Sequence, residues 1–325
     1  MRSRAAGWGL LLAVGLALPW LIYPVLAVDI LAWGLFAAAF DILLGCTGLL
    51  SFGHAAFFGT GAYAAAVVAL RLGVAFPWDA VAGAVAAALL ALPLMALSIR
   101  RTGISFAMIT LAFAQMVFYV ANAWRSLTGG ENGITGVPRG EVLGWSLSPA
   151  VAYYYAAFPL VALGLLLCWR IVRSPFGRVL LAIRENEVRT QSLGYPVSRY
   201  KLIATVLSCA LSGLAGGVWV LNHGFVALDA VHWTTSGTVV VMVLLGGMAT
   251  RLGPLVGAAL VMLLRDFLSR WTDAWGIATG TIFIAVILVF RQGIVGTLEG
   301  LVAGRGGPAA APAAPPVEEA ASGLR

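Results

Sequence analysis

Residues 30–70 read ILAWGLFAAAFDILLGCTGLLSFGHAAFFGTGAYAAAVVAL, a stretch in which Asp41 is the only formally charged residue. A helix needs roughly 20 apolar residues to cross a hydrocarbon core of about 30 Å. The stretch is long enough for two crossings, separated only by the uncharged residues Leu49 to Ser51. It therefore predicts membrane helices. Broken or re-entrant helices are an alternative to plain spans here and at 236–249, which is short and contains a glycine pair.

The same apolar character extends along the chain. Of its 325 residues, 61% are hydrophobic and only 10% are charged, which excludes an ordinary soluble globular protein. Apolar runs bounded by charges, glycines and prolines predict an all-α, polytopic transmembrane bundle of about ten helices. The predicted spans are 8–28, 30–48, 52–70, 79–99, 104–123, 150–170, 202–222, 236–249, 254–270 and 275–290.

Basic residues gather on one side of this predicted bundle. If the N-terminus is cytoplasmic, 15 of the 20 Lys and Arg residues lie on the cytoplasmic side, and 171–201 is the longest loop there. Because such a bias is typical of cytoplasmic loops, we predict that both termini and this loop face the cytoplasm. The net charge of +7 then reflects topology rather than nucleic acid binding. Residues 1–303 form the transmembrane domain on this prediction, and 304–325 form a disordered cytoplasmic tail.

The chain carries none of the motifs of nucleotide or metal chemistry. It has no GxxxxGK[ST] sequence that would cradle ATP phosphates. Its three histidines make no metal-ligand spacing with its cysteines or carboxylates, and the cysteines sit singly in apolar runs. We therefore predict no catalytic residue, no metal and no cofactor in this chain.

The cytoplasmic loop contains the segment SPFGRVLLAIRENEVRTQSLGYPVSRYK, from Ser174 to Lys201. Ser174 suits an N-cap, Pro175 suits the first helical position, and Gly194 together with Pro196 suits a stop, so the segment predicts one short capped helix. Its expected apolar face contains Val179, Leu180, Ile183 and Val188, and Glu185 lies four residues before Arg189.

Two interpretations of this helix remain open. An amphipathic helix at the end of a span can rest on anionic lipid. It can also dock a cytoplasmic partner, and the acids Glu185 and Glu187 favour docking because they gain nothing from an anionic surface.

Several polar residues fall inside or beside the predicted spans. Asp41 is the only acid that we place well inside a span, where an ionisable group is costly and is a functional candidate by default. Ser51, His54, Gln115 and Asn222 could line a polar translocation path. Each is equally explained by a hydrogen bond between helices.

The predicted outer loop 127–138 reads LTGGENGITGVP. Its density of Gly, Thr and Asn predicts a structured turn. Such a turn could form a docking face or a gate, or it could simply reflect the geometry of an exposed loop.

Taken in order, five segments make the chain resemble the LivM-type permease of branched-chain amino acid ABC transporters, from about residue 25 to 297. They are LSFGHAAFFGTGAY at 50–63, ITLAFAQ at 109–115, LTGGENGITGVP at 127–138, SPFGRVLLAIRENE at 174–187 and LLGGMATRLGPLVGA at 244–258.

This resemblance implies the permease subunit of an ATP-driven importer in the bacterial inner membrane. The expected partners are a second homologous permease, two cytoplasmic ATPase subunits that bind the ATP, and a periplasmic substrate-binding protein. The expected substrates are branched-chain amino acids, with urea, short amides or aromatic acids as alternatives. The residues alone also leave open an ion-coupled secondary carrier that uses Asp41, and a membrane scaffold that transports nothing.

The resemblance also assigns a role to the cytoplasmic loop. Its implied ATPase-coupling residues are Arg184, Glu185, Asn186, Glu187, Arg189 and Gly194. The chain departs from the family pattern at Val188, Arg189 and Thr190, which stand where alanines are usual. We expect this departure to affect pairing with a particular ATPase.

Overall fold

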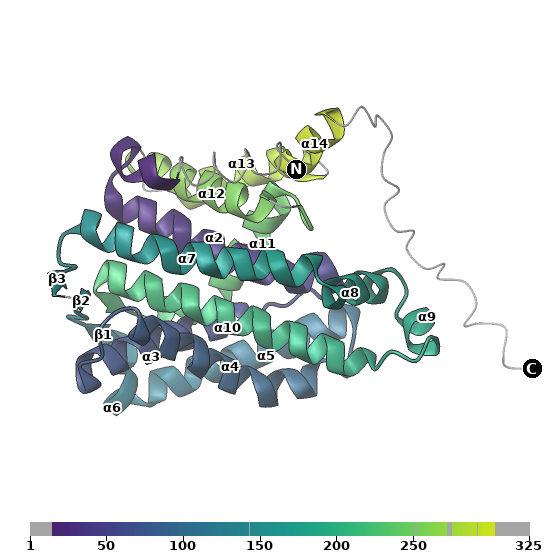
Figure 1. The fold of residues 1–325 in the computed structure, drawn as a ribbon, viewed down its shortest axis with the longest axis horizontal. Helices are drawn as coiled ribbons and strands as arrows, with labels where there is room; N and C mark the ends of the chain where they lie inside the picture. Colours follow the sequence, from purple (N-terminus) through teal and green to yellow (C-terminus); the bar gives the residue numbers. More distant parts are fainter. Residues whose placement is uncertain (1–14, 143, 251, 272–274, 291, 303–325) are drawn as a thin grey trace, which may run out of the picture.

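The structure is a computed structural model that describes residues 15–142, 144–250, 252–271, 275–290 and 292–302. Its helices lie mostly along one common axis, as Figure 1 shows. Six of the described helices are long and apolar enough to cross a membrane: α2 (Pro24–Thr47), α3 (His54–Leu72), α4 (Trp78–Ser98), α5 (Gly103–Ala123), α7 (Ala150–Arg173) and α10 (Val197–His223).

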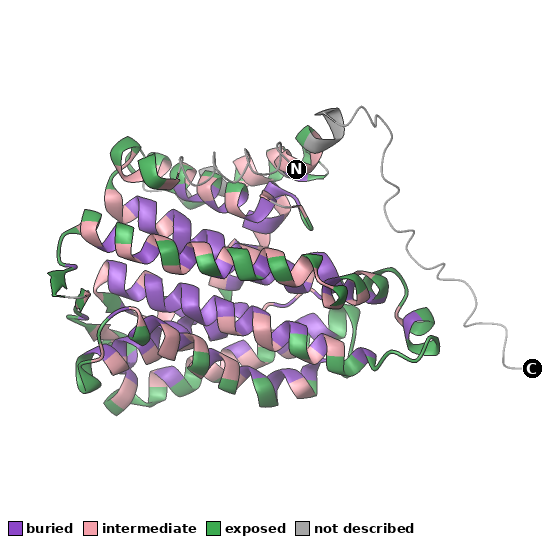
Figure 2. Ribbon diagram, viewed as in Figure 1, coloured by how far each residue is buried: buried purple, intermediate pink, exposed green. Residues whose placement is uncertain are grey.

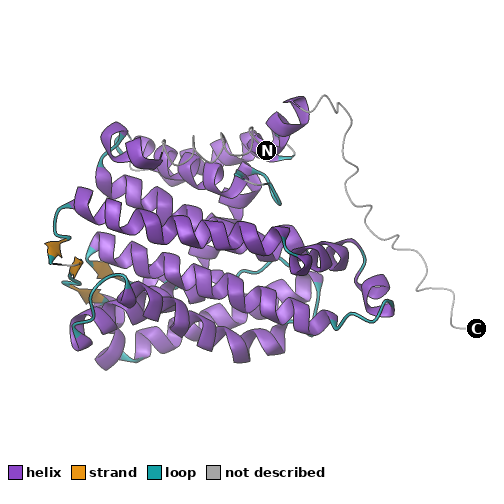
Figure 3. Cartoon of the chain, in the orientation of Figure 1, coloured by secondary structure: helices purple, strands orange, loops and turns teal. Residues whose placement is uncertain are grey.

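Shorter elements lie at the ends and on one side of this bundle. One end carries α6 (Arg125–Thr128), the 3-10 helix η1 (Gly130–Asn132) and two small antiparallel sheets, in which β1 (Ile134–Thr135) pairs with β4 (Phe225–Val226), and β2 (Glu141–Val142) pairs with β3 (Trp145–Ser146) (Figure 3). The opposite end carries α8 (Pro175–Glu185) and α9 (Glu187–Ser192). The remaining elements are η2 (Leu228–Ala230), α11 (Trp233–Gly246), α12 (Gly253–Ser269), α13 (Trp275–Val289) and α14 (Gly293–Val302).

The predicted count of about ten spans is not confirmed. Helices α11, α12 and α13 have 14, 17 and 15 residues, which is short for a crossing. The predicted boundary between 8–28 and 30–48 is wrong, because α2 already begins at Pro24, whose fixed φ suits the first helical position. The predicted tail at 304–325 lies outside the described residues.

Helix α2 forms the centre of the molecule. Nearly all of its side chains are buried, among them Leu35, Phe36 and Phe40, because α7, α10, α11 and α12 surround it. Figure 2 shows α2 almost entirely buried, whereas the outer helices are exposed along one face. The exposed residues on those faces are apolar, such as Leu89 on α4 and Ile104 on α5, as expected for surfaces that contact lipid.

Glycines bring α3, α4 and α10 into backbone contact. A Cβ atom at Gly61 would lie 2.2 Å from the carbonyl oxygen of Gly213, and one at Gly83 would lie 2.5 Å from the carbonyl oxygen of Gly61. Lipid chains provide no hydrophobic force between helices, so close contact of small residues is a main source of their association. The close packing that small residues predict for this part of α3 is therefore observed.

We predict that Gly61→Ala destabilises the protein. The added methyl group meets backbone atoms of Gly213 that cannot rotate away, so we expect a loss of about 1–3 kcal/mol. Gly237→Ala in α11 is the matched control, because a Cβ atom there meets nothing within 4 Å. Thermal unfolding of the two purified variants tests this, and equal midpoints would contradict it.

Candidate functional site

The linker between α2 and α3 is a non-helical segment that is largely buried. Gly48, with a φ of 72°, ends α2, and residues 48–53 then run without a helix to the start of α3. Backbone groups in such a segment must find partners in the protein, because lipid supplies none. The Phe52 N–H donates to Thr110 Oγ1 at 3.2 Å, and the Gly53 N–H donates to Ser51 Oγ at 3.1 Å. Ser51 therefore satisfies the backbone of its own turn.

The first turn of α3 is held in the same way. The Ala55 N–H donates to the hydroxyl of Ser236 on α11 at 2.8 Å. His54 is fully buried, and its Nε2 lies 2.9 Å from Ser208 Oγ on α10. The Ser208 hydroxyl donates to the Ala39 carbonyl at 2.6 Å, so Nε2 of His54 is the donor to Ser208. His54 thus links α2, α3 and α10.

Asp41 connects α2 to the turn between α11 and α12. Both of its carboxylate oxygens accept the Ala249 N–H, at 3.1 and 3.2 Å. Ala249 has a φ of 56°, which is unusual for a residue other than glycine. Gly45, one helical turn further along α2, leaves room for this contact, since a Cβ atom there would lie 2.3 Å from Asp41 Oδ1. Asp41 therefore secures a strained turn.

Arg184 joins the end of α8 to the same part of α2. Its Nη1 donates to the Gly45 carbonyl at 2.5 Å. Because Gly45 lies one turn from Asp41, the contacts form a continuous connection from α8, through the end of α2, to the turn at Ala249.

Helices α8 and α9 replace the single helix that the sequence predicts for this loop. The predicted N-cap is confirmed, because Ser174 Oγ accepts the Gly177 N–H at 3.2 Å and Pro175 follows it. Asn186, however, adopts an extended conformation and accepts the Arg189 N–H at 2.9 Å, so it caps a second helix. The prediction of one uninterrupted helix is wrong at this residue.

The break at Asn186 also rotates the second helix. Leu180 and Ile183 on α8 are buried against Cys46 of α2, as the predicted apolar face requires. Val188, predicted on that face, is instead 74% exposed. The predicted continuous helical face is therefore interrupted before α9 begins.

The pairing of charges in this loop differs from the expected spacing of Glu185 and Arg189. Glu187 Oε2 lies 2.6 Å from Nζ of Lys201, the only lysine in the chain. The Lys201 side chain is 2% exposed and that of Glu187 is 40% exposed. This ion pair fixes α9 to the beginning of α10. Sequence reasoning did not assign Lys201 to the site. Its status as the only lysine in the chain was a signal that could have pointed to it.

The other predicted path residues lie apart from Asp41. Gln115 is half-buried on α5. The amide of Asn222 donates to the Val25 carbonyl at 3.0 Å and to Asp29 Oδ1 at 3.1 Å, near the other end of α2. Twelve residues of helix separate Asp29 from Asp41, roughly 18 Å along the axis. The predicted set therefore does not form one site.

Asp29 is a polar residue that sequence reasoning missed. It lies in the second turn of α2, so Asp41 is not the only acid inside a span. Its Oδ1 also lies 2.9 Å from Nε2 of His223, so it receives two contacts from the end of α10. It was missed because the predicted boundary between spans 8–28 and 30–48 leaves residue 29 outside both spans.

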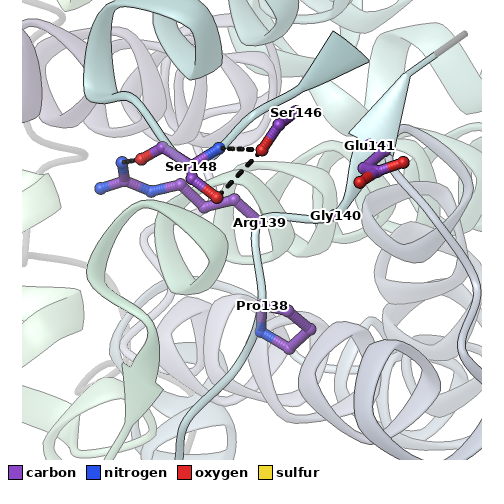
Figure 4. A pocket seen from close by; sticks show the side chains of 6 residues that line it. All are labelled: Pro138, Arg139, Gly140, Glu141, Ser146 and Ser148. Carbon is purple, nitrogen blue, oxygen red and sulfur yellow. Dashed lines mark hydrogen bonds between the residues drawn. The ribbon is translucent and has the colours of Figure 1, made fainter. Parts of the chain in front are cut away.

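The strand end of the bundle contains a cavity of about 440 Å³, shown in Figure 4. Arg139 lies at its edge and donates to the carbonyls of Ser148 and Asn222 at 2.8 and 2.9 Å. Glycines with positive φ shape the neighbouring loop, including Gly129, Gly130 and Gly133. The structured turn predicted for 127–138 is thus confirmed. The cavity is lined by Pro138, Arg139, Gly140, Glu141, Ser146 and Ser148.

Comparison with known proteins places this arrangement in a family. Residues 23–291 match the family described as "Branched-chain amino acid transport system / permease component". The chain belongs to this permease family. The permease is 28% identical over 283 residues to the high-affinity branched-chain amino acid transport system permease protein LivM of Escherichia coli (strain K12), covering 78% of this chain and 65% of that protein.

Other relatives are similar over shorter or comparable lengths. LivM of Salmonella typhimurium is 27% identical over 282 residues, which is 78% of the permease and 65% of LivM. The guanosine ABC transporter permease protein NupQ of Bacillus subtilis is 29% identical over 84 residues, which is 26% of the permease and 25% of NupQ. The permease thus spans just under two thirds of the length of its LivM relatives. No solved structure matches it significantly.

We predict that the two partners of the Glu187–Lys201 pair respond unequally to substitution. Glu187→Gln leaves a buried ammonium without its counter-ion, whereas Lys201→Met leaves a carboxylate that water can reach. Glu187→Gln should therefore lower the thermal unfolding midpoint more than Lys201→Met. The double variant should regain most of the thermal stability that Glu187→Gln loses. Additive losses in the double variant would show that the two charges do not interact.

Proposed function

We propose that the permease is the membrane subunit of an ATP-driven importer, and that α8 and α9 receive the motion of separate ATPase subunits. One observation carries this proposal. Helices α8 and α9 lie at one end of the bundle, and apolar side chains are exposed there on α9 and directly after it, with Val188 at 74% and Leu193 at 72%. Large apolar side chains exposed on a polar segment are typical of a protein-binding surface.

The surroundings of these two residues fit a docking face. Glu185, Asn186 and Arg189 are exposed beside them, so polar groups surround an apolar centre. Gly194 has a φ of 89°, which favours glycine where the chain turns back toward α10. The set therefore supports the proposed coupling role of Arg184, Glu185, Asn186, Glu187, Arg189 and Gly194.

The proposed importer has the orientation that the basic residues favour. The α8–α9 end faces the cytoplasm and its ATPases, and the strand end faces the periplasm, where a substrate-binding protein delivers its cargo. A second permease completes the pathway, and ATP is bound by the ATPases alone. Movement of the docked segment would then be a rigid-body switch between two access states.

Branched-chain amino acids are the proposed cargo, since the LivM relatives are named for them. The similarity to a guanosine permease makes nucleosides a second candidate. Uptake of radiolabelled leucine and guanosine, with urea as a further comparison, separates these substrates once the cognate binding protein and ATPases are present.

The docking face predicts a defect in assembly. Val188→Asp places a charge at the centre of the apolar surface, so we expect the ATPase subunits no longer to co-purify with the permease. Gln191→Asp is the matched control, because Gln191 is an exposed polar residue on the same helix. Equal recovery of ATPase with both variants would contradict the assigned docking face.

The contact between α8 and α2 predicts a defect in coupling. Arg184→Gln removes the charged donor to Gly45, so we expect substrate uptake in proteoliposomes to fall at least fivefold while ATP hydrolysis continues. Arg178→Gln, an exposed arginine on the same helix, should transport normally. Proportional loss of both activities would contradict coupling through this contact. A different result would instead favour an ion-coupled carrier: substrate uptake in the absence of any ATPase, with that uptake abolished by Asp41→Asn.

A further inference from the structure

A second cavity lies where α7 ends and α8 begins. Its volume is about 270 Å³, and it is lined by Trp169, Arg170, Arg173, Ser174 and Pro175. Two of these five side chains are cationic and none is acidic. The cavity is distinct from the contacts of Arg184 and Glu187, which lie at the far end of α8 and on α9.

The turn between α7 and α8, which borders this cavity, is tight. Gly177 allows α8 to turn tightly against the end of α7, since a Cβ atom there would lie 2.1 Å from the Val172 carbonyl oxygen. The Ser174 hydroxyl donates to the Ile171 carbonyl at 2.7 Å while it accepts the Gly177 N–H. The turn is therefore fixed by its own hydrogen bonds.

One of the two arginines at the cavity is oriented by an aromatic ring, and neither has an acidic partner among the described residues. The Arg173 guanidinium lies 4.8 Å from the centre of the Trp169 ring, a cation–π contact that restricts its position. In the described part of the chain, neither Arg170 nor Arg173 has a carboxylate within ion-pair distance. Two guanidinium groups beside one cavity suit a phosphate group, whose oxygens accept their N–H groups in pairs.

The surface that leads to the cavity is apolar. Leu163, Leu166 and Leu167 are exposed on α7, and they lie seven, four and three residues before Arg170. Residues at these spacings share one face of a helix. The same face therefore presents leucines along the bundle and arginines at its end.

We propose that this cavity binds the phosphate of an anionic phospholipid, whose acyl chains lie along the leucines of α7. The basic groups supply the headgroup site, and the exposed leucines supply the contact with the chains. Basic pockets at the membrane ends of helices suit such headgroups. A free phosphate ion would use the arginines but not the leucines, so the two sources can be distinguished. This inference needs only that α7 spans the membrane and is independent of the proposed importer function.

The test is a titration of the full-length protein with phosphatidylglycerol or phosphatidylcholine, followed by native mass spectrometry. We expect wild-type protein to retain phosphatidylglycerol preferentially. Each basic group near an anionic lipid contributes about a fivefold affinity, so Arg170→Gln/Arg173→Gln should weaken retention roughly 30-fold. Arg173→Lys keeps the charge but loses the planar donor pair, so it should weaken retention of phosphatidylglycerol by a smaller factor. This variant provides the test if the double variant does not fold.

Two controls define the outcomes that would overturn the proposal. Arg100→Gln/Arg101→Gln removes the same charge from an exposed pair that follows α4, and it should leave the preference unchanged. An equal loss in this control would show that only general surface charge matters. If millimolar inorganic phosphate competes for the site as effectively as phosphatidylglycerol does, the cavity is a free-phosphate site instead.

Discussion

The constraint on which this structure depends is that backbone N–H and C=O groups inside a membrane must be paired within the protein. A continuous helix meets this requirement by itself, and each interruption needs partners from elsewhere. Two interruptions lie beside α2, at residues 48–53 and at the turn around Ala249. Ser51 and Thr110 satisfy the first, and Asp41 satisfies the second. Ser51, Thr110 and Asp41 are therefore explained by the backbone groups that they satisfy.

This constraint also explains why α8 is connected to the interior. The last carbonyls of a helix have no partner within it. Near the end of α2, the Gly45 carbonyl receives the guanidinium of Arg184 from α8. The helix that we propose to contact the ATPases is thus hydrogen-bonded to the helix at the centre of the bundle. A displacement of α8 would act on α2 directly, and through Asp41 on the turn between α11 and α12.

The sequence predicted those features that depend on neighbouring residues. The cap at Ser174, the first-position Pro175 and the turn at 127–138 follow from local chemistry. Contacts between distant segments could not be predicted in this way. Asn222 reaches Asp29 across 193 residues, and Arg184 reaches Gly45 across 139. These pairs become visible only when α2, α8 and α10 are placed together.

The errors have physical causes as well. A periodic apolar pattern continues across Asn186, but the side chain of that residue caps a new helix and interrupts the old one. The first spans were divided at the charge of Asp29, although Asp29 is partnered inside α2 by Asn222 and His223. The predicted number of spans is not confirmed, because apolar composition does not distinguish a crossing helix from shorter helices such as α11 and α12.

The central claim is that α8, the end of α2 and the turn at Ala249 respond together to the ATPases. Hydrogen–deuterium exchange of the assembled transporter, with and without a trapped ATP state, measures this directly. Peptides covering 41–53 and 244–258 should change their exchange rates together in the wild-type protein, and both changes should be lost in Arg184→Gln. If exchange in these peptides is unaffected by nucleotide, or if it changes equally in the variant, the contact with α8 does not transmit the motion.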